Sequence, residues 1–332
     1  MKRVYAVALA VTILAGCNSE QAGMKISGTA QESLKLLPAE SNLVLFCDFQ
    51  KINETPLAKQ ILSEFKDHIR EQTDEDFESF KAETGLDPQK DFHNLLIGSV
   101  LSKSRGQQKA FVIMKGDFDE NRIIEFVRIK SQQENREIPW TEKQVAGKTI
   151  YVIKKSKNEF GVCFADASTI YLGPQSWLTS VLDGTLGESL IDRPQYLGDL
   201  VKNVKYGDQL WMALDAKTLT AQSESFASEL RRNMPAFERV ESVVFSAKAN
   251  GAVDFNGMLL CDSNESGQVM VDLMKGALAA AKLAVSNERT KVDELNKIKV
   301  FQEGKVAVLQ GELTDEFFKT LQESQFHKWN EF

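Results

Sequence analysis

The apolar residues of this chain are gathered in short runs, each of a length that suits one β-strand. Leu43–Cys47 and Ala110–Met114 are two such runs. Residues 143–153 and 160–172 each predict a hairpin, and Asp119 is typical of a residue that caps the start of a helix. Strands and hairpins that alternate with single helices predict an α+β fold, with largely antiparallel sheets and helices packed on one face.

Other helices are predicted from their ends and their composition. Thr55-Pro56 is typical of a helix start, and the apolar residues that follow fall on one helical face: Leu57, Ile61, Leu62, Phe65 and Ile69. Pro174 starts a short helix that Gly184 ends. Lys275–Val285 is rich in Gly and Ala, which predicts close packing of a helix on a sheet. A groove for a partner helix is the alternative.

Three segments of the first half recur, in the same order, in the second half. The matches are Leu43–Asp48 with Leu210–Asp215 (offset 167), Ala110–Met114 with Gly257–Cys261 (offset 147) and Gly147–Val152 with Gly304–Leu309 (offset 157). Apolar positions coincide although identity is low, so the pattern favours a divergent internal duplication, with chance as the alternative. It predicts one α+β repeat over 34–185, a connecting helical segment over 186–207 and a second repeat over 208–332.

The N-terminus carries two basic residues and then an apolar segment, Val4–Ala15. As a helix this segment would span about 18 Å, well short of a hydrocarbon core of about 30 Å. It is therefore typical of a secretory signal rather than of a membrane span. The segment ends in Leu14-Ala15-Gly16-Cys17, which resembles the lipobox of bacterial lipoproteins. A buried helix with a chance cysteine is the alternative.

The resemblance covers residues 1–17 and implies that residues 1–16 are a signal peptide and that Cys17 carries lipid. It implies an exported protein, lipid-anchored to a bacterial membrane, with its folded part in the periplasm or outside the cell. Asn18 stands where inner-membrane retention favours Asp, which leans towards the outer membrane. Residues 17–33 are polar and rich in small residues, which predicts a flexible tether.

Composition excludes several classes of protein. Apolar residues make up 42% of the 332 residues, which is enough to bury a core and argues against disorder over most of the length. No apolar run reaches the about 18 residues of a membrane-spanning helix, so a polytopic membrane protein is excluded. A net charge of −7 argues against nucleic acid as a main partner, because such binding is driven by Lys and Arg.

Besides Cys17, the chain has Cys47, Cys163 and Cys261, each within an apolar strand-like run. Burial as small apolar side chains is the preferred interpretation. One disulfide with a thiol left over is the alternative. No pair has the Cys/His spacing of a zinc site, and no metal or other cofactor is expected.

Candidate catalytic motifs are incomplete. Gly147–Thr149 resembles the end of a phosphate-binding P-loop, but Glu142 replaces the glycine that the loop needs. Asp117–Asn121 spaces oxygen ligands like a calcium loop, but Arg122 and Arg128 occupy the glycine and bidentate-carboxylate positions. A turn and a helix cap explain these segments better.

The remaining chemistry-bearing residues give no catalytic set. The three histidines, His68, His93 and His327, are scattered in sequence, which argues against a histidine-centred site. Asp48 and Asp215 end two matching strands, and turn formation is their expected role. The sequence therefore predicts a lipid-anchored binding or interaction module of the cell envelope, with a protein or lipid partner. The alternative is an envelope hydrolase that uses paired carboxylates.

Overall fold

The computed structural model describes residues 32–55, 79–101, 109–153, 159–192, 207–218 and 235–317, and the single residues Leu197, Val201 and Val204. Cys17 and the helix predicted after Thr55 lie outside these residues. Residues 32–34 form a helical turn in which Ser33 and Leu34 are buried, so packed structure begins just before the predicted end of the tether.

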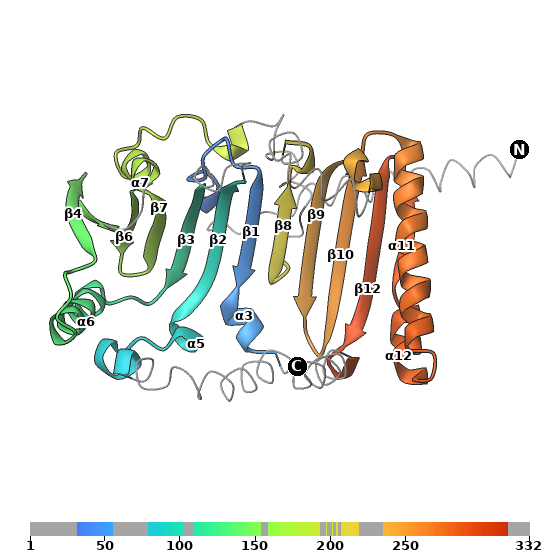
Figure 1. Cartoon of the computed structure of the whole chain (residues 1–332), viewed down its shortest axis with the longest axis horizontal. Coiled ribbons are helices and arrows are strands. Elements are labelled where there is room, and N and C mark those ends of the chain that lie inside the picture. Colours follow the sequence, from blue (N-terminus) through green and yellow to red (C-terminus); the bar gives the residue numbers. More distant parts are fainter. Residues whose placement is uncertain are drawn as a thin grey trace, which may run out of the picture.

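In the described residues, twelve strands form one continuous antiparallel sheet (Figure 1). Their bounds are β1 Leu43–Asp48, β2 Phe92–Val100, β3 Lys109–Gly116, β4 Trp140–Val145, β5 Lys148–Ile153, β6 Phe160–Asp166, β7 Thr169–Pro174, β8 Leu210–Leu214, β9 Val240–Ala249, β10 Ala252–Cys261, β11 Lys299–Glu303 and β12 Val306–Thr314. Across the sheet the order is β11-β12-β10-β9-β8-β1-β2-β3-β7-β6-β5-β4. The predicted α+β class with antiparallel strands is confirmed.

The helices begin and end at residues with clear local roles. Their bounds are α3 Phe49–Asn53, α5 Pro88–Asp91, α6 Glu120–Gln133, α7 Gln175–Leu182, α11 Asn264–Ala284 and α12 Arg289–Asn296, with 3-10 turns η1 Leu190–Asp192 and η3 Pro235–Arg239. Asp119 caps α6 as predicted, because its Oδ1 accepts a hydrogen bond from Arg122 N at 3.1 Å. Pro174 precedes α7, and Gly184 follows it with φ 73°. In the described part of the chain, no helix is long and apolar enough to span a membrane.

Helices cover both faces of the sheet. Ile150 and Val152 pack with α7, whereas Tyr151 between them packs with α6 on the opposite face. The strand registers place Leu259 of β10, which packs under α11, on the same side as α6. We call the two sides the α7 face and the α6 face. The prediction that helices pack on one face is wrong, because strands such as β5 bear apolar side chains on both faces.

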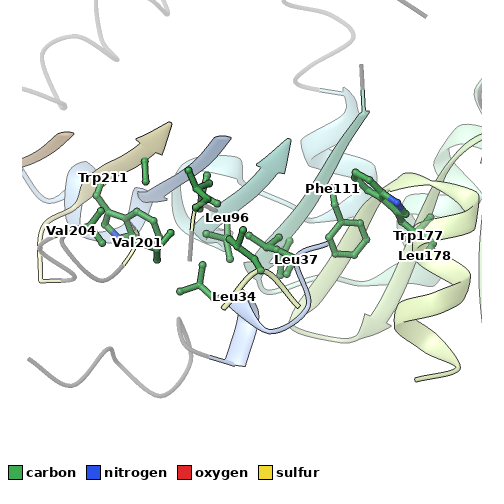
Figure 2. Packing of buried hydrophobic residues seen from close by; sticks show 14 of the residues in the cluster. Leu34, Leu37, Leu96, Phe111, Trp177, Leu178, Val201, Val204 and Trp211 are labelled. Carbon is green, nitrogen blue, oxygen red and sulfur yellow. The ribbon is translucent and has the colours of Figure 1, made fainter. Parts of the chain in front are cut away.

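The largest buried cluster lies on the α7 face and runs through the middle of the sheet (Figure 2). Trp211 of β8 is fully buried and stacks on Phe46 of β1 with ring centroids 5.3 Å apart. Leu37 lies over β2 at Gly98, where a Cβ would meet the Leu37 side chain at 2.9 Å. Side chains from the connecting segment complete this cluster: Leu190, Leu197, Val201 and Val204.

The β1 and β8 strands join the two halves of the sheet. Leu45 pairs with Met212 at the centre of this ladder. At one end Asp48 N donates to Gln209 O at 2.7 Å, and at the other end Asp215 N donates to Asn42 O at 2.9 Å. The two halves therefore share a continuous backbone hydrogen-bond network across the middle of the molecule.

A buried side-chain amide stands just before each of these two strands. Asn42 Nδ2 donates to Leu101 O at 2.9 Å, and Leu101 N donates to Asn42 Oδ1 at 2.8 Å. Gln209 Nε2 donates to Ala249 O at 2.9 Å, and Ala249 N donates to Gln209 Oε1 at 2.6 Å. Each amide thus satisfies both backbone groups of one residue at the end of the neighbouring strand. We call Asn42 and Gln209 the amide clamps.

Helix α11 differs from the prediction of close small-residue packing over 275–285. Its close approach to the sheet is earlier, at Gly267, where a Cβ would meet Lys305 O at 3.2 Å. At Gly276 a Cβ would meet nothing within 4 Å, and Ala277 and Ala280 are exposed. The second half of α11 packs inward through Leu278, so its small residues face outward.

Candidate functional site

The described surface has a large apolar groove at the end of the sheet near β4. The groove has a volume of about 650 Å³. The C-terminal half of α6 and the segment that leads to β4 line it: Phe126, Val127, Lys130, Ser131, Glu134, Arg136, Glu137, Ile138 and Pro139. Ile138 is 37% exposed and contributes apolar surface to this hollow. We call this hollow the apolar groove.

The end of α6 gives the groove its shape. Asn135 has φ 55°, and its N–H donates to Gln132 O at 3.1 Å. Arg136 N donates to Ser131 O at 2.8 Å. These two bonds form a Schellman motif, which ends the helix and turns the chain back along it. Ile138 and Pro139 consequently lie beside the last turns of α6.

The groove has an apolar floor and a charged rim. Phe126 contacts Phe80 edge-on with ring centroids 5.2 Å apart, and Lys130 Nζ lies 5.9 Å from the centroid of the Phe126 ring. At the rim Arg136 Nη1 lies 2.8 Å from Glu134 Oε2. Apolar lining with a few charges around it is suited to binding an apolar side chain or a short apolar segment.

A polar hollow of about 430 Å³ lies at the other end of the sheet, across β9, β10, β12 and β11. Three lysines and three acids line it: Lys248, Lys297, Lys299, Asp208, Asp254 and Glu312. Lys297 Nζ lies 2.7 Å from Glu294 Oε1, and this carboxylate raises the pKa of the lysine. We call this lysine- and acid-lined site the polar hollow.

Two carboxylates of the polar hollow stand directly opposite each other. Asp254 of β10 pairs with Glu312 of β12, and Lys248 of β9 pairs with Asp254 on its other side. Side chains directly opposite on antiparallel strands have Cβ atoms about 5 Å apart, so the two carboxyl groups come within reach of one substrate. Both acids are exposed. No sequence motif indicates this pair, because strand register alone brings the two residues together.

Asp48 and Asp215 act as turn residues, as expected. Asp48 Oδ1 accepts from Lys51 N at 3.0 Å, and Asp215 Oδ1 accepts from Thr218 N at 2.9 Å. The β1–β8 register puts them at opposite ends of the strand pair, about 20 Å apart along the strands. They do not form a carboxylate pair.

The three cysteines of the described chain are free thiols. Cys163 and Cys261 are fully buried, and Cys47 is half-buried. Burial raises the pKa of the Cys47 and Cys163 thiols to about 11, which keeps both protonated and poorly nucleophilic at neutral pH. The interpretation as buried apolar side chains is confirmed for Cys163 and Cys261.

Of the three histidines, His93 is the one within the described residues. Its Nε2 lies 3.4 Å from Asp117 Oδ2. The described part of the chain contains no group of three or more His, Cys, Asp or Glu residues that could hold a metal ion. Asp117 therefore lies beside His93, and among the described residues it belongs to no recognisable cation site.

Comparisons with known proteins add little to this description. No protein-family model matches the chain, and no curated protein matches it. A solved structure described as "Structure of crystal form I of TP0453" is similar with a TM-score of 0.41 and 10% sequence identity, over 88% of this chain and 96% of that chain. A likeness this distant carries no argument about function.

Proposed function

We propose that the protein is a lipid-anchored, extracytoplasmic binding protein of a bacterial cell envelope. The observation that carries this proposal is Leu14-Ala15-Gly16-Cys17, placed after a basic and a short apolar segment at the N-terminus. Acyl chains on Cys17 would hold the chain at a bilayer, since each buried methylene contributes about 0.8 kcal/mol. Binding without catalysis fits the incomplete catalytic motifs of the sequence.

The central cluster on the α7 face is filled by side chains rather than by a ligand. We therefore assign a protein partner, and not a lipid, to the apolar groove. The groove lies at the surface and exposes Ile138 and Pro139 beside α6. Such a shape fits an apolar segment of another protein better than it fits an enclosed lipid.

Replacing Ile138 with aspartate is expected to abolish partner capture while leaving the fold intact. The change puts a carboxylate into the apolar groove, where an apolar segment would have to desolvate it. The measurement is crosslinking in intact cells followed by quantitative mass spectrometry of co-purified proteins. Ala146→Asp, which adds the same carboxylate at an exposed hairpin turn outside the groove, is the matched control. If the Ile138→Asp variant still captures the partner, the apolar groove is not the binding site.

The paired carboxylates of the polar hollow favour a second candidate function, an envelope hydrolase. Asp254 and Glu312 would then act as acid and base on a polar substrate such as a glycan. Asp254→Asn is expected to lower hydrolysis of purified envelope glycans by at least about 100-fold if the pair is catalytic. Thr141→Ala, on the exposed part of β4, is the control. Equal product release by the native chain and Asp254→Asn would exclude this function.

We further propose that the sheet consists of two copies of one ancestral unit. The order β1-β2-β3-β7 in the first half parallels β8-β9-β10-β12 in the second, and α6 and α11 each follow the third strand on the same face. An offset of 167 residues carries Leu45 onto its own ladder partner Met212, as a two-fold axis between β1 and β8 requires. It also carries Asn42 onto Gln209, so the amide clamps correspond.

The ladders refine the matches found in the sequence. Under this proposal β7 is the counterpart of β12, because β12 lies beside β10 as β7 lies beside β3. The sequence match of Gly304–Leu309 with Gly147–Val152 had instead paired β12 with β5. The β4–β5 hairpin extends the first half only, within the described chain. Under this proposal the first repeat spans 34–185 and the second begins at 208, with the connecting segment 186–207 between them.

A further inference from the structure

Strand β4 forms one edge of the sheet, and its outer side carries backbone groups that pair with no described strand. On its inner side β4 pairs with β5, through a hairpin with a two-residue turn at Ala146-Gly147. The residues that flank such a turn form a hydrogen-bonded pair, and these pairs alternate with non-hydrogen-bonded ones along the ladder. The N–H and C=O groups of Trp140, Glu142 and Gln144 consequently point away from β5. We call this outer side of β4 the open edge.

The two edges of the sheet differ in what lies beside them. The four residues from Thr141 to Gln144 are exposed, and among the described residues none bonds the three outward-pointing peptide groups of β4. At the opposite edge α11 packs against β11, where Gln302 Nε2 donates to Asn264 O of that helix at 2.7 Å. Figure 1 shows α11 along that end of the sheet and β4 at the other end. The open edge therefore offers donors and acceptors to an added strand.

A second copy of this chain is a poor occupant of the open edge. Outward-pointing positions must face each other, so β4 can pair with itself over most of its length in two antiparallel registers. One register sets Glu142 against Glu142 of the second copy, and the other sets Lys143 against Lys143 of the second copy. Like charges directly opposite each other destabilise a strand pair. The charges of β4 thus disfavour self-pairing and favour a different strand of complementary charge.

The open edge leads into the apolar groove. Ile138 and Pro139 line the groove and directly precede Trp140, the first residue of β4. A strand that runs antiparallel to β4 past Trp140 therefore reaches the groove with its next residues. One extended segment can then make main-chain hydrogen bonds along the edge and place an apolar side chain in the groove.

We propose that β4 is a docking edge, at which an extended segment of another protein adds an antiparallel strand to the sheet and inserts an apolar side chain into the apolar groove. The segment carries a basic residue opposite Glu142 and an acidic residue opposite Lys143. Glu142 Oε1 accepts from Arg128 Nη2 at 2.8 Å, so the second carboxylate oxygen serves the basic residue of the partner. This inference rests on the proposed protein partner of the groove and specifies how that partner binds.

A synthetic peptide built to these requirements is the first probe. Its sequence is Thr-Thr-Glu-Lys-Val-Ile-Thr-Leu, in which the glutamate faces Lys143, the lysine faces Glu142 and the last leucine reaches Ile138. Fluorescence anisotropy of the labelled peptide is expected to show saturable binding to the full-length chain in detergent micelles. Exchanging the glutamate and the lysine is expected to weaken binding about tenfold, because like charges then face each other at both positions. Equal affinity of the two peptides, or no saturable binding of either, would overturn the proposal.

Proline tests whether the backbone of β4 makes the contact. Glu142→Pro removes an N–H of the open edge but leaves the β5 ladder intact, since Glu142 is a non-hydrogen-bonded position. Glu142→Thr is the matched control, because it loses the same carboxylate and keeps the N–H. The proline variant is expected to bind the peptide at least about tenfold more weakly than the threonine variant. Circular dichroism checks the fold, and Gln144→Pro provides the same test at the next open position. Equal binding by the proline and threonine variants would contradict strand addition.

Capture of a partner in intact cells separates this inference from the proposed function. Loss of one partner in both Ile138→Asp and Glu142→Pro, with retention in Glu142→Thr, would support both. If Glu142→Pro retains a partner that Ile138→Asp loses, the groove binds a protein but β4 adds no strand, and this inference alone is wrong. If the native chain captures no partner, the proposed function and this inference are both wrong.

Discussion

Cys17→Ser is expected to abolish incorporation of labelled palmitate and to remove the protein from the detergent phase of a Triton X-114 extract. The serine hydroxyl cannot take the thioether-linked diacylglyceride that the lipobox resemblance implies for Cys17. Two or more acyl chains anchor a protein stably, whereas the short Val4–Ala15 segment is below the length of a membrane span. The measurement is autoradiography of the immunoprecipitated chain together with its partition between the two phases.

Cys261→Ser is the matched control for this prediction. Cys261 is fully buried and far along the chain, so its replacement removes a thiol without touching the proposed lipid site. The control is expected to keep the label and the detergent partition of the parent chain. Label retained by Cys17→Ser would show that lipid is attached elsewhere, and the proposed anchor would then be wrong.

Removal of both amide clamps is expected to have the largest effect on stability. Asn42→Ala leaves the N–H and C=O of Leu101 without their partner, and Gln209→Ala does the same to Ala249. Asn42 and Gln209 are 2% and 7% exposed, so water replaces these bonds poorly. Each change is expected to lower the free energy of unfolding by about 2–4 kcal/mol. The clamps stand at opposite ends of the β1–β8 pair, so the losses add in the double variant.

Urea unfolding followed by circular dichroism measures these losses. Gln144→Ala is the control, because its amide bonds the exposed hairpin at Thr149 Oγ1 and its loss is expected to cost less than about 0.5 kcal/mol. Similar losses for the two clamps would support their correspondence in the proposed duplication. A loss confined to one clamp would contradict that correspondence.

Local signals predicted most of the individual elements. The hairpin turn at Ala146-Gly147, with φ 49° and 78°, and the cap at Asp119 depend on neighbours in sequence, so the pattern is visible there. The sequence does not predict the joining of β1 to β8, because it depends on pairing between residues 163 to 171 positions apart. The sequence does not predict that helices cover both faces of the sheet. Apolar residues at consecutive strand positions, as in Ile150–Val152, do not indicate which helix covers which side.

The candidate sites were less predictable than the fold. The apolar groove depends on a Schellman turn at Asn135, which brings Ile138 back along α6. The Asp254–Glu312 pair depends on the β10–β12 register. Lys275–Val285 was correctly predicted to be helical, but the prediction that its small residues pack closely on the sheet was wrong. Gly and Ala allow close approach without fixing which neighbour makes it, and here the close contact is at Gly267.

The position of β1 in the middle of the sheet has a consequence for the order in which the molecule is made. A chain emerges from its N-terminus first, so β1 can pair with β2 while β8 is still unsynthesised. During that interval one side of β1 presents unpaired amide and carbonyl groups along Leu43–Cys47, a surface open to pairing with other chains. Nascent or truncated molecules that stop before residue 210 are therefore the species most exposed to aggregation.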